Sequence, residues 1–206
     1  MQEKFNEKQI NILEAAEKLI IKDGVENASV RDIAKEANVS IAMINYHFGS
    51  KDKMMEALYC YCTEKIGERF SLFIQTISYA GPPIQISEII SFLVKQILRL
   101  SYFHNIGLQE VSIRNNLAET LTVLYALFVD RVDDIILKGI AAGHFKKAAK
   151  AEELLASIIG TLMFSIWNKD FYQGFLPQNA QYLEALEHKN SVYLRAMIFG
   201  LLGYDE

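Results

Sequence analysis

The chain has 206 residues, of which 51% are apolar and 22% charged, and its net charge is −4. This composition is that of a globular protein long enough to bury a core without disulfides or metals, and it excludes a uniformly basic nucleic-acid-binding protein. Any contact with DNA must therefore come from a local surface. The polar N-terminus lacks the apolar segment of a signal peptide, and no apolar run reaches the ~20 residues that a bilayer requires, so we expect a cytoplasmic protein without a membrane segment.

The N-terminal residues predict a helix that begins after Asn6 and ends at Gly24. Asn6 is a favourable N-cap, and Gln9 lies three residues later, as in a capping box. Apolar residues then recur every three or four positions and form one stripe. Glycine readily adopts the left-handed conformation that ends many helices, so Gly24 marks the C-terminus of this helix.

Two short helices joined by a tight turn follow over residues 29–48. Ser29 and Ser40 are suitable N-caps for them, and Asn38 tolerates the left-handed conformation that the turn requires. Small residues such as Ala34 let the two helices cross closely, and this spacing is typical of a helix-turn-helix. In such a motif the second helix lies in the major groove of DNA.

Helical periodicity continues to the C-terminus, and no strand signal interrupts it. Ser50 caps a long fourth helix that we expect to reach about Ile77, and Gly81-Pro82-Pro83 forms the clearest loop. Four further helical stretches are expected near residues 84–101, 106–140, 150–171 and 180–203. The sequence therefore predicts an all-α fold with an N-terminal three-helix head and a larger helical remainder.

The predicted second helix of the turn motif carries side chains suited to DNA. Ala42 and Met43 can contact thymine methyl groups, and Asn45 can pair with adenine. Hydroxyl, imidazole and cationic groups in and around the motif suit phosphate oxygens. The candidate DNA-binding residues are Ser29, Arg31, Ser40, Ala42, Met43, Asn45, Tyr46, His47 and Lys51.

An ordinary helical bundle explains the same pattern equally well. Short capped helices with a small-residue crossing occur in such bundles too. Residues 1–55 carry eight Lys or Arg and nine Asp or Glu, so charge does not favour DNA binding. The alternative to a DNA-binding protein is therefore a helical protein-interaction module.

Four segments of the N-terminal region combine into a more specific pattern: Ile12–Ala16 with Gly24, Ser29–Ala34, Ala37–Ser40, and Tyr46–Phe48 followed by Lys51. On these segments, residues 10–58 resemble the DNA-binding domain of tetracycline-repressor (TetR) family regulators. In that family the positions matching Ser29, Ser40, Ala42, Met43, Asn45, Tyr46, His47 and Lys51 typically face DNA. Asn38 stands where the family usually has Gly, Met54 where Leu is usual, and Asn45 where an aromatic residue is common. Asn45 therefore leaves the operator sequence open.

The resemblance implies two domains, a helix-turn-helix domain over residues 1–50 and a helical ligand-binding and dimerisation domain over residues 51–206. The apolar stretches 150–171 and 180–203 contain Gly160 and Gly200, which permit close helix contact. Two such faces would form a four-helix interface with a second subunit. Burial inside one subunit is the alternative.

A ligand pocket is typically apolar with a few polar groups, and several segments mix aromatic and polar residues in this way. The candidate ligand-binding residues are Phe70, Phe73, Phe92, Gln96, Tyr102, Phe103, His104, Arg114, Trp167 and Tyr172. Aromatic residues at helical spacing are, however, more often core.

No enzyme motif is present, and the four histidines are scattered, so we expect no catalytic residue, no metal site and no cofactor. Cys60 and Cys62 lie two residues apart on a predicted helix and point to different sides, so we expect unbridged thiols. The sequence predicts a homodimeric repressor that binds a palindromic double-stranded DNA operator and responds to a small, mostly apolar effector bound within residues 60–175. Helix 51–77 is the predicted lever between the two functions.

Overall fold

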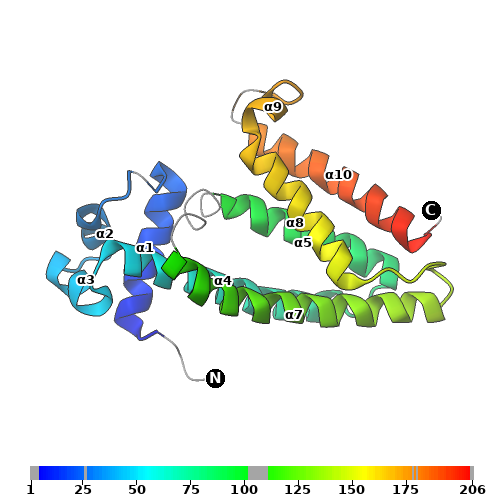
Figure 1. Ribbon diagram of the computed structural model, residues 1–206, viewed down its shortest axis with the longest axis horizontal. Coiled ribbons are helices and arrows are strands. Elements are labelled where there is room, and N and C mark those ends of the chain that lie inside the picture. The colour runs from blue at the N-terminus through cyan, green and yellow to red at the C-terminus, as the bar shows by residue number, and fades with distance from the viewer. Residues whose placement is uncertain (1–4, 26, 102–110, 178, 180, 205–206) are drawn as a thin grey trace. The chain divides into compact units, whose positions relative to one another are not determined.

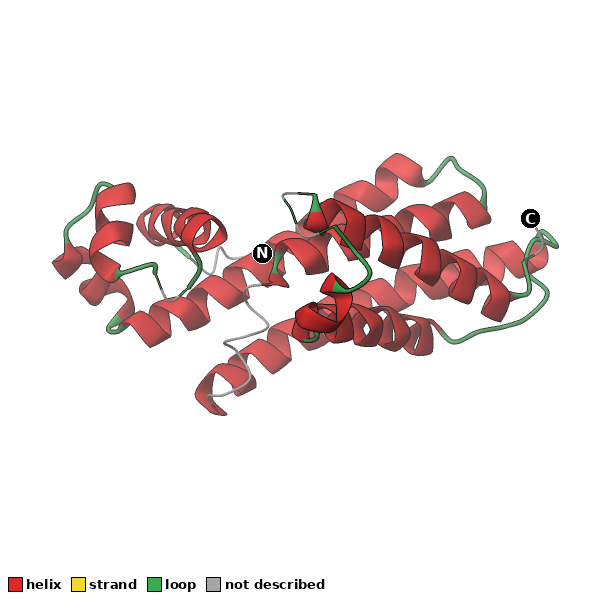
Figure 2. Cartoon of the chain, turned by 90° about the horizontal axis from the view of Figure 1, so that it is seen from above, coloured by secondary structure: helices red, strands yellow, loops and turns green. Residues whose placement is uncertain are grey.

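The computed structural model describes residues 5–25, 27–101, 111–177, 179 and 181–204, and for residues 111–118 the backbone alone. Every regular element in this part of the chain is a helix, which confirms the predicted all-α fold (Figure 2). Contacts divide the chain into two compact units, residues 1–65 with 105–121 (unit 1) and residues 66–104 with 122–206 (unit 2). No helix in the described ranges is long and apolar enough to cross a membrane.

Unit 1 begins with three helices, α1 (Glu7–Asp23), α2 (Val30–Glu36) and α3 (Ile41–Phe48) (Figure 1). The predicted capping box of α1 is confirmed. The Asn6 side chain accepts a hydrogen bond from the Gln9 backbone N–H at 3.0 Å, and the Gln9 side chain accepts one from the Asn6 backbone N–H at 3.1 Å. Ser29 and Ser40 each accept a hydrogen bond from the backbone N–H three residues later, both at 3.2 Å. Each of the three predicted N-caps is therefore correct, so local side-chain chemistry sets where these helices begin.

The turn between α2 and α3 depends on Asn38, which has a φ of 53°. A side chain in this left-handed region is uncommon, and asparagine is among the residues that tolerate it. The side-chain amide of Asn11 on α1 donates a hydrogen bond to the Ala37 carbonyl at 2.8 Å. Ile33 of α2 is 0% and Ile44 of α3 1% exposed, and α2 packs against both α1 and α3. Buried packing and one long-range hydrogen bond therefore hold the turn.

Helix α4 (Lys51–Ile77) starts in unit 1, where Ser50 accepts a hydrogen bond from the Lys53 backbone at 3.2 Å as predicted. A polar network joins α4 to α1. Both the Tyr61 hydroxyl and the Lys65 ammonium donate to Oε1 of Glu14, each at 2.7 Å. These two hydrogen bonds, led by the one from Lys65, lower the pKa of Glu14 below its ordinary value. The network therefore favours the ionised form of Glu14 in the folded unit.

Unit 2 contains the rest of α4 together with α5 (Pro82–Arg99), α7 (Val111–Ala141) from Thr122 onward, α8 (Ala151–Trp167), α9 (Lys169–Gln173) and α10 (Tyr182–Leu202). Helix α5 packs against both α8 and α10, which also contact each other. The core of unit 2 is built from side chains that are almost completely buried, including Phe70, Ile90, Leu162, Leu194 and Ile198. Burial of this apolar surface is the main force that orders the unit.

The helix predicted over residues 150–171 is wrong in one respect, because it is interrupted at Asn168. This residue has φ −109° and ψ 45°, outside the helical region. The Phe164 carbonyl accepts two hydrogen bonds from Asn168, one from its backbone N–H at 3.0 Å and one from its side-chain amide at 2.9 Å. Asparagine side chains readily form such local hydrogen bonds to the backbone, and α9 begins at Lys169. The other predicted helices of unit 2 agree with α5 and α10 to within a few residues, and the start of the predicted helix 106–140 lies outside the described residues.

Candidate nucleic-acid interface

Helix α3 is held by two side chains and presents the others to solvent. Ile44 is 1% and Phe48 8% exposed, and both face the core of unit 1. The candidate DNA-binding residues within the helix are exposed, apart from half-buried His47: Ala42, Met43, Asn45 and Tyr46. Tyr46 is 83% exposed, and its ring meets the neighbouring His47 ring edge-on, with centroids 5.2 Å apart. The outward residues therefore add little to the packing of the fold and remain available for a partner.

The two candidate serines already have structural roles. Ser29 caps α2 and also donates its hydroxyl to the Asp32 carboxylate, and Ser40 caps α3. Both side chains are exposed. Arg31 is exposed on α2, and Lys51 is half-buried at the first turn of α4. All nine candidates thus lie within unit 1 around the helix-turn-helix.

The surface around α3 carries few charged side chains. Helix α3 carries no charged side chain other than the titratable His47. Glu36 on α2 forms an ion pair with Lys18 of α1 at 2.5 Å, which removes one cation from the set that could reach phosphates. Few counterions would be released on binding, so sequence discrimination must rest on α3 itself rather than on general attraction to DNA.

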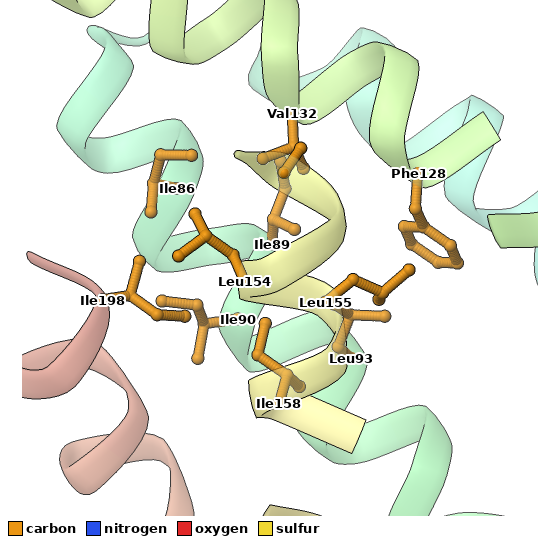
Figure 3. A pocket seen from close by; sticks show the side chains of 11 residues that line it. Ile86, Ile89, Ile90, Leu93, Phe128, Val132, Leu154, Leu155, Ile158 and Ile198 are labelled. Carbon is orange, nitrogen blue, oxygen red and sulfur yellow. The ribbon is translucent and has the colours of Figure 1, made fainter. Parts of the chain in front are cut away.

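Unit 2 contains a small apolar cavity between α5, α7, α8 and α10. Figure 3 shows side chains from these helices directed toward one space. Its volume is about 20 Å³, which is room for about one water molecule. The lining carries no polar side chain and consists of Ile86, Ile89, Ile90, Leu93, Phe128, Val132, Ala151, Leu154, Leu155, Ile158 and Ile198. Sequence reasoning missed this site because aliphatic residues at helical spacing carry no signal that separates a cavity wall from solid core.

None of the candidate ligand-binding residues lines that cavity. Phe73 and Phe92 stack with ring centroids 4.8 Å apart, and Phe70 lies 5.6 Å from Phe92, so these three form one aromatic cluster. Gln96 is half-buried, and its buried Oε1 has no hydrogen-bond partner. The other candidates are dispersed: Trp167 is 53% exposed at the end of α8, and Tyr172 lies on α9. Tyr102, Phe103, His104 and the side chain of Arg114 lie outside the described residues.

Helices α8 and α10 divide their apolar residues between two faces. The residues turned into unit 2 include Leu154, Ile158, Leu162, Leu194 and Ile198, all 3% exposed or less. Other apolar or small residues of these helices are exposed, namely Ala156, Gly160, Phe164 and Trp167 on α8 and Val192, Tyr193, Ala196 and Gly200 on α10. A Cβ atom at Gly160 or Gly200 would meet nothing within 4 Å. Burial within one subunit, the alternative considered for these stretches, therefore leaves several of their apolar residues exposed.

Within the described ranges no group of three or more His, Cys, Asp or Glu lies close enough to hold a metal ion. Cys60 and Cys62 are both buried and not disulfide-bonded, and Cys60 accepts a weak hydrogen bond from Thr120 at 3.7 Å.

Two short helices joined by a tight turn, as in α2 and α3, form the helix-turn-helix motif that places its second helix in the major groove of DNA. Residues 12–58 match the family of bacterial regulatory proteins named for tetR. A stretch of 46 residues is 46% identical to the HTH-type nicotine-responsive transcriptional repressor HdnoR of Paenarthrobacter nicotinovorans. The aligned stretch spans 22% of this chain and only 24% of that relative. The segment that carries the helix-turn-helix therefore belongs to the TetR family, as its motifs predicted.

Solved structures extend the similarity to the fold of nearly the whole chain. The fatty acid degradation regulator FadR from Bacillus halodurans has a TM-score of 0.65 and 20% identity, and the alignment covers 94% of this chain and 97% of that one. The transcriptional regulator FadR from Bacillus subtilis, solved in complex with stearoyl-CoA, has a TM-score of 0.62 and 20% identity, with coverage of 91% and 97%. At such identity the similarity shows the fold alone.

Proposed function

We propose that this protein is a homodimeric transcription regulator that binds a palindromic double-stranded DNA operator and responds to a small, mostly apolar effector. The observation that carries the proposal is the outward face of α3, where Met43, Asn45 and Tyr46 are exposed although α3 is firmly packed through Ile44 and Phe48. An α-helix of this kind fits the major groove. The family of the N-terminal segment consists of bacterial regulatory proteins, which supports regulation rather than catalysis.

The residues take distinct roles in this proposal. Ala42, Met43 and Asn45 read base edges, and Asn45 selects adenine. Phosphate oxygens are held by Ser29, Arg31, Ser40, Tyr46, His47 and Lys51. Residues 1–50 form the DNA-binding domain, and residues 51–206 bind the effector and the second subunit. Since the target is chromosomal DNA, the protein acts in the bacterial cytoplasm.

The second subunit is proposed to cover the exposed apolar face of α8 and α10. Large apolar patches on a protein surface mark interaction sites, and a two-fold axis places the same face of both subunits in contact. Gly160 and Gly200 allow close approach there, because nothing lies within 4 Å of an added Cβ. Gly200→Arg should therefore yield a monomer in sedimentation velocity, whereas Glu152→Arg, on an exposed but polar position of α8, should stay dimeric. A dimeric Gly200→Arg would remove this face from the proposal.

The effector is proposed to bind within residues 60–175. Its binding favours a conformation in which the α3 helices of the two subunits no longer match the spacing of the operator half-sites. Helix α4 is proposed to transmit this change. HdnoR is described as nicotine-responsive and the FadR of Bacillus subtilis was solved with stearoyl-CoA, which supports response to small molecules. The aromatic cluster of Phe70, Phe73 and Phe92, with Gln96 nearby on α5, is one candidate wall. Coupling requires that the effector bind the two conformations with different affinity. Equal affinity of an effector for DNA-bound and DNA-free protein would remove the coupling.

The test of the whole proposal is selection of the purified chain against a randomised duplex library, followed by a salt titration on the enriched sequence. A palindrome bound by a dimer, with affinity that falls as salt rises, is the expected result. Asn45→Ala should relax selection at one base pair per half-site, at a cost of about 1–3 kcal/mol in discrimination. No enrichment at low salt, with or without candidate effectors, would favour the helical protein-interaction module instead.

A further inference from the structure

A buried tyrosine of α4 contacts both α1 and the residue before its N-cap. Tyr61 is 6% exposed, and its hydroxyl donates a hydrogen bond to Oε1 of Glu14 at 2.7 Å. Its ring meets the ring of Phe5 edge-on, with centroids 6.1 Å apart. One side chain of α4 therefore touches the chain at the entrance to α1 and again inside that helix. Two separated points of contact fix the direction of α1 against α4 as well as the distance between them.

The carboxylate of Glu14 receives a second donor from α4. The ammonium group of Lys65 donates to the same Oε1 at 2.7 Å and lies 4.5 Å from the centroid of the Tyr61 ring. Hydrogen bonds to an ionised group are stronger than neutral ones, and a cation over an aromatic face adds to them. These three residues form the Glu14 network, which therefore favours one orientation of α1 on α4. The Glu14 side chain is 53% exposed, so its replacement disturbs little packing.

This orientation extends to the helix that is proposed to read DNA. Helix α1 packs against α2, and α2 packs against α3, so α1, α2 and α3 form one three-helix head. Lys65 is the last residue of α4 in unit 1, and α4 continues to Ile77 in unit 2, which carries the proposed dimer face. The Glu14 network thus holds the head on the helix that leads into the dimerising unit.

We infer that Glu14 and Tyr61 are positioning residues that determine which spacing between operator half-sites the dimer accepts. This rests on the proposed dimeric operator-binding function and adds to it how the spacing is set. A turn of B-DNA contains about 10–10.5 base pairs, so one added base pair rotates a half-site by about 35° around the DNA axis. To follow that rotation the head must break the Glu14 network, whereas a head without the network follows it at lower cost.

Fluorescence anisotropy with the full chain tests the inference on four duplexes: the selected operator, the same operator with one base pair added or removed between the half-sites, and a single half-site. Wild type should lose about tenfold in affinity when the spacing changes, as breaking one charge-assisted hydrogen bond predicts. Glu14→Ala keeps a good helix former at an exposed position but removes the acceptor, so its affinities for the three spacings should differ by less than about threefold. Its affinity for the single half-site should stay within about twofold of wild type, because α3 is unchanged.

Conservative variants separate the hydrogen bonds from the packing. Tyr61→Phe keeps the ring beside Phe5 but loses the hydroxyl, so it should flatten the spacing dependence in part. Glu14→Gln keeps an acceptor oxygen and should retain more of the dependence than Glu14→Ala. The matched control is Lys18→Gln, which breaks the 2.5 Å ion pair between Lys18 and Glu36. That pair joins α1 to α2 within the head, so the spacing dependence of wild type is expected.

Three outcomes overturn the inference. The first is a Glu14→Ala variant with the spacing dependence of wild type. The second is an equal loss of affinity on all four duplexes, which would show that the network only stabilises the fold; urea midpoints measured in parallel identify that case. The third is flattening by Lys18→Gln as strong as that by Glu14→Ala. Absence of a palindromic operator or of a spacing optimum in wild type contradicts the proposed function itself, whereas an optimum that survives Glu14→Ala contradicts this inference alone.

Discussion

Substitution of Tyr46 by alanine separates DNA contact from folding more cleanly than any other change in α3. The side chain is 83% exposed, and no hydrogen bond from its hydroxyl is found within the described residues. Exposed side chains without such contacts contribute within about ±0.5 kcal/mol to the free energy of unfolding. Tyr46→Ala should therefore leave the urea midpoint unchanged.

The expected loss in operator affinity is much larger. A hydrogen bond to a charged phosphate contributes about 1.5–3 kcal/mol, which corresponds to about 10- to 150-fold in affinity for each subunit. A dimer places two such tyrosines on the operator, so the free-energy loss doubles for the complete complex. Fluorescence anisotropy with the selected operator and with single-base variants measures this loss, and a phosphate contact predicts the same decrease for all of them. Tyr46→Phe, which removes only the hydroxyl, should reproduce most of the effect.

The matched control is Tyr79→Ala, because Tyr79 is 89% exposed and lies in unit 2 after the end of α4. It should change neither stability nor operator affinity. Wild-type affinity of Tyr46→Ala would refute the phosphate contact. A decrease confined to one base position would show instead that Tyr46 contacts a base.

Three further predictions concern the stability of the fold and are checked by urea unfolding. Asn38→Ala should cost about 1 kcal/mol because of the positive φ, whereas Asn38→Gly should be neutral or stabilising; equal effects would contradict the strain argument. At Gly139 an added Cβ would lie 2.2 Å from the buried Phe145 ring, so Gly139→Ala should cost about 1–3 kcal/mol and Phe145→Leu should relieve part of that cost; simple additivity would contradict the clash. The lowered pKa of Glu14 contributes stability that is present above the unfolded-state pKa and lost as pH falls through the folded one. Glu14→Gln should therefore flatten the loss of stability between ~pH 6 and ~pH 3, by less than about 1 kcal/mol because the carboxylate is half exposed, and an unchanged slope would contradict the role of Lys65.

The helix starts and the turn in the N-terminal part of unit 1 could be predicted in detail, because they depend on capping residues and dihedral preferences that are local in the sequence. Asn6, Ser29, Ser40 and Ser50 each cap the helix that follows through a backbone group no more than three residues away, and Asn38 takes the predicted conformation within its own dihedral angles. Such effects depend on a few neighbouring residues and survive any change in tertiary context. They are therefore readable from a single sequence.

The details of unit 2 could not be predicted because they depend on residues far apart in the chain. Lys150 precedes α8 but gives no side-chain cap; the Ala151 backbone donates instead to Asp133 of α7 at 3.3 Å. Arg195 meets Ser91, which is 104 positions away. Periodicity predicts which face of a helix is buried, yet not which helix covers it. For this reason the residues that line the cavity were absent from the sequence-based candidates, whereas the aromatic residues among those candidates include a packed cluster.

The two units also differ in what their sequences must satisfy. A surface that fits the major groove has little freedom, because B-DNA presents one groove width and a fixed set of base-edge groups. Unit 2 needs only apolar residues at helical spacing, and many sequences of similar volume fill a core equally well. This explains why the identity to HdnoR is 46% but limited to 46 residues, whereas the alignment with FadR from Bacillus halodurans covers 94% of this chain at 20% identity. It follows that a family similarity carries over the mode of DNA contact more safely than the effector.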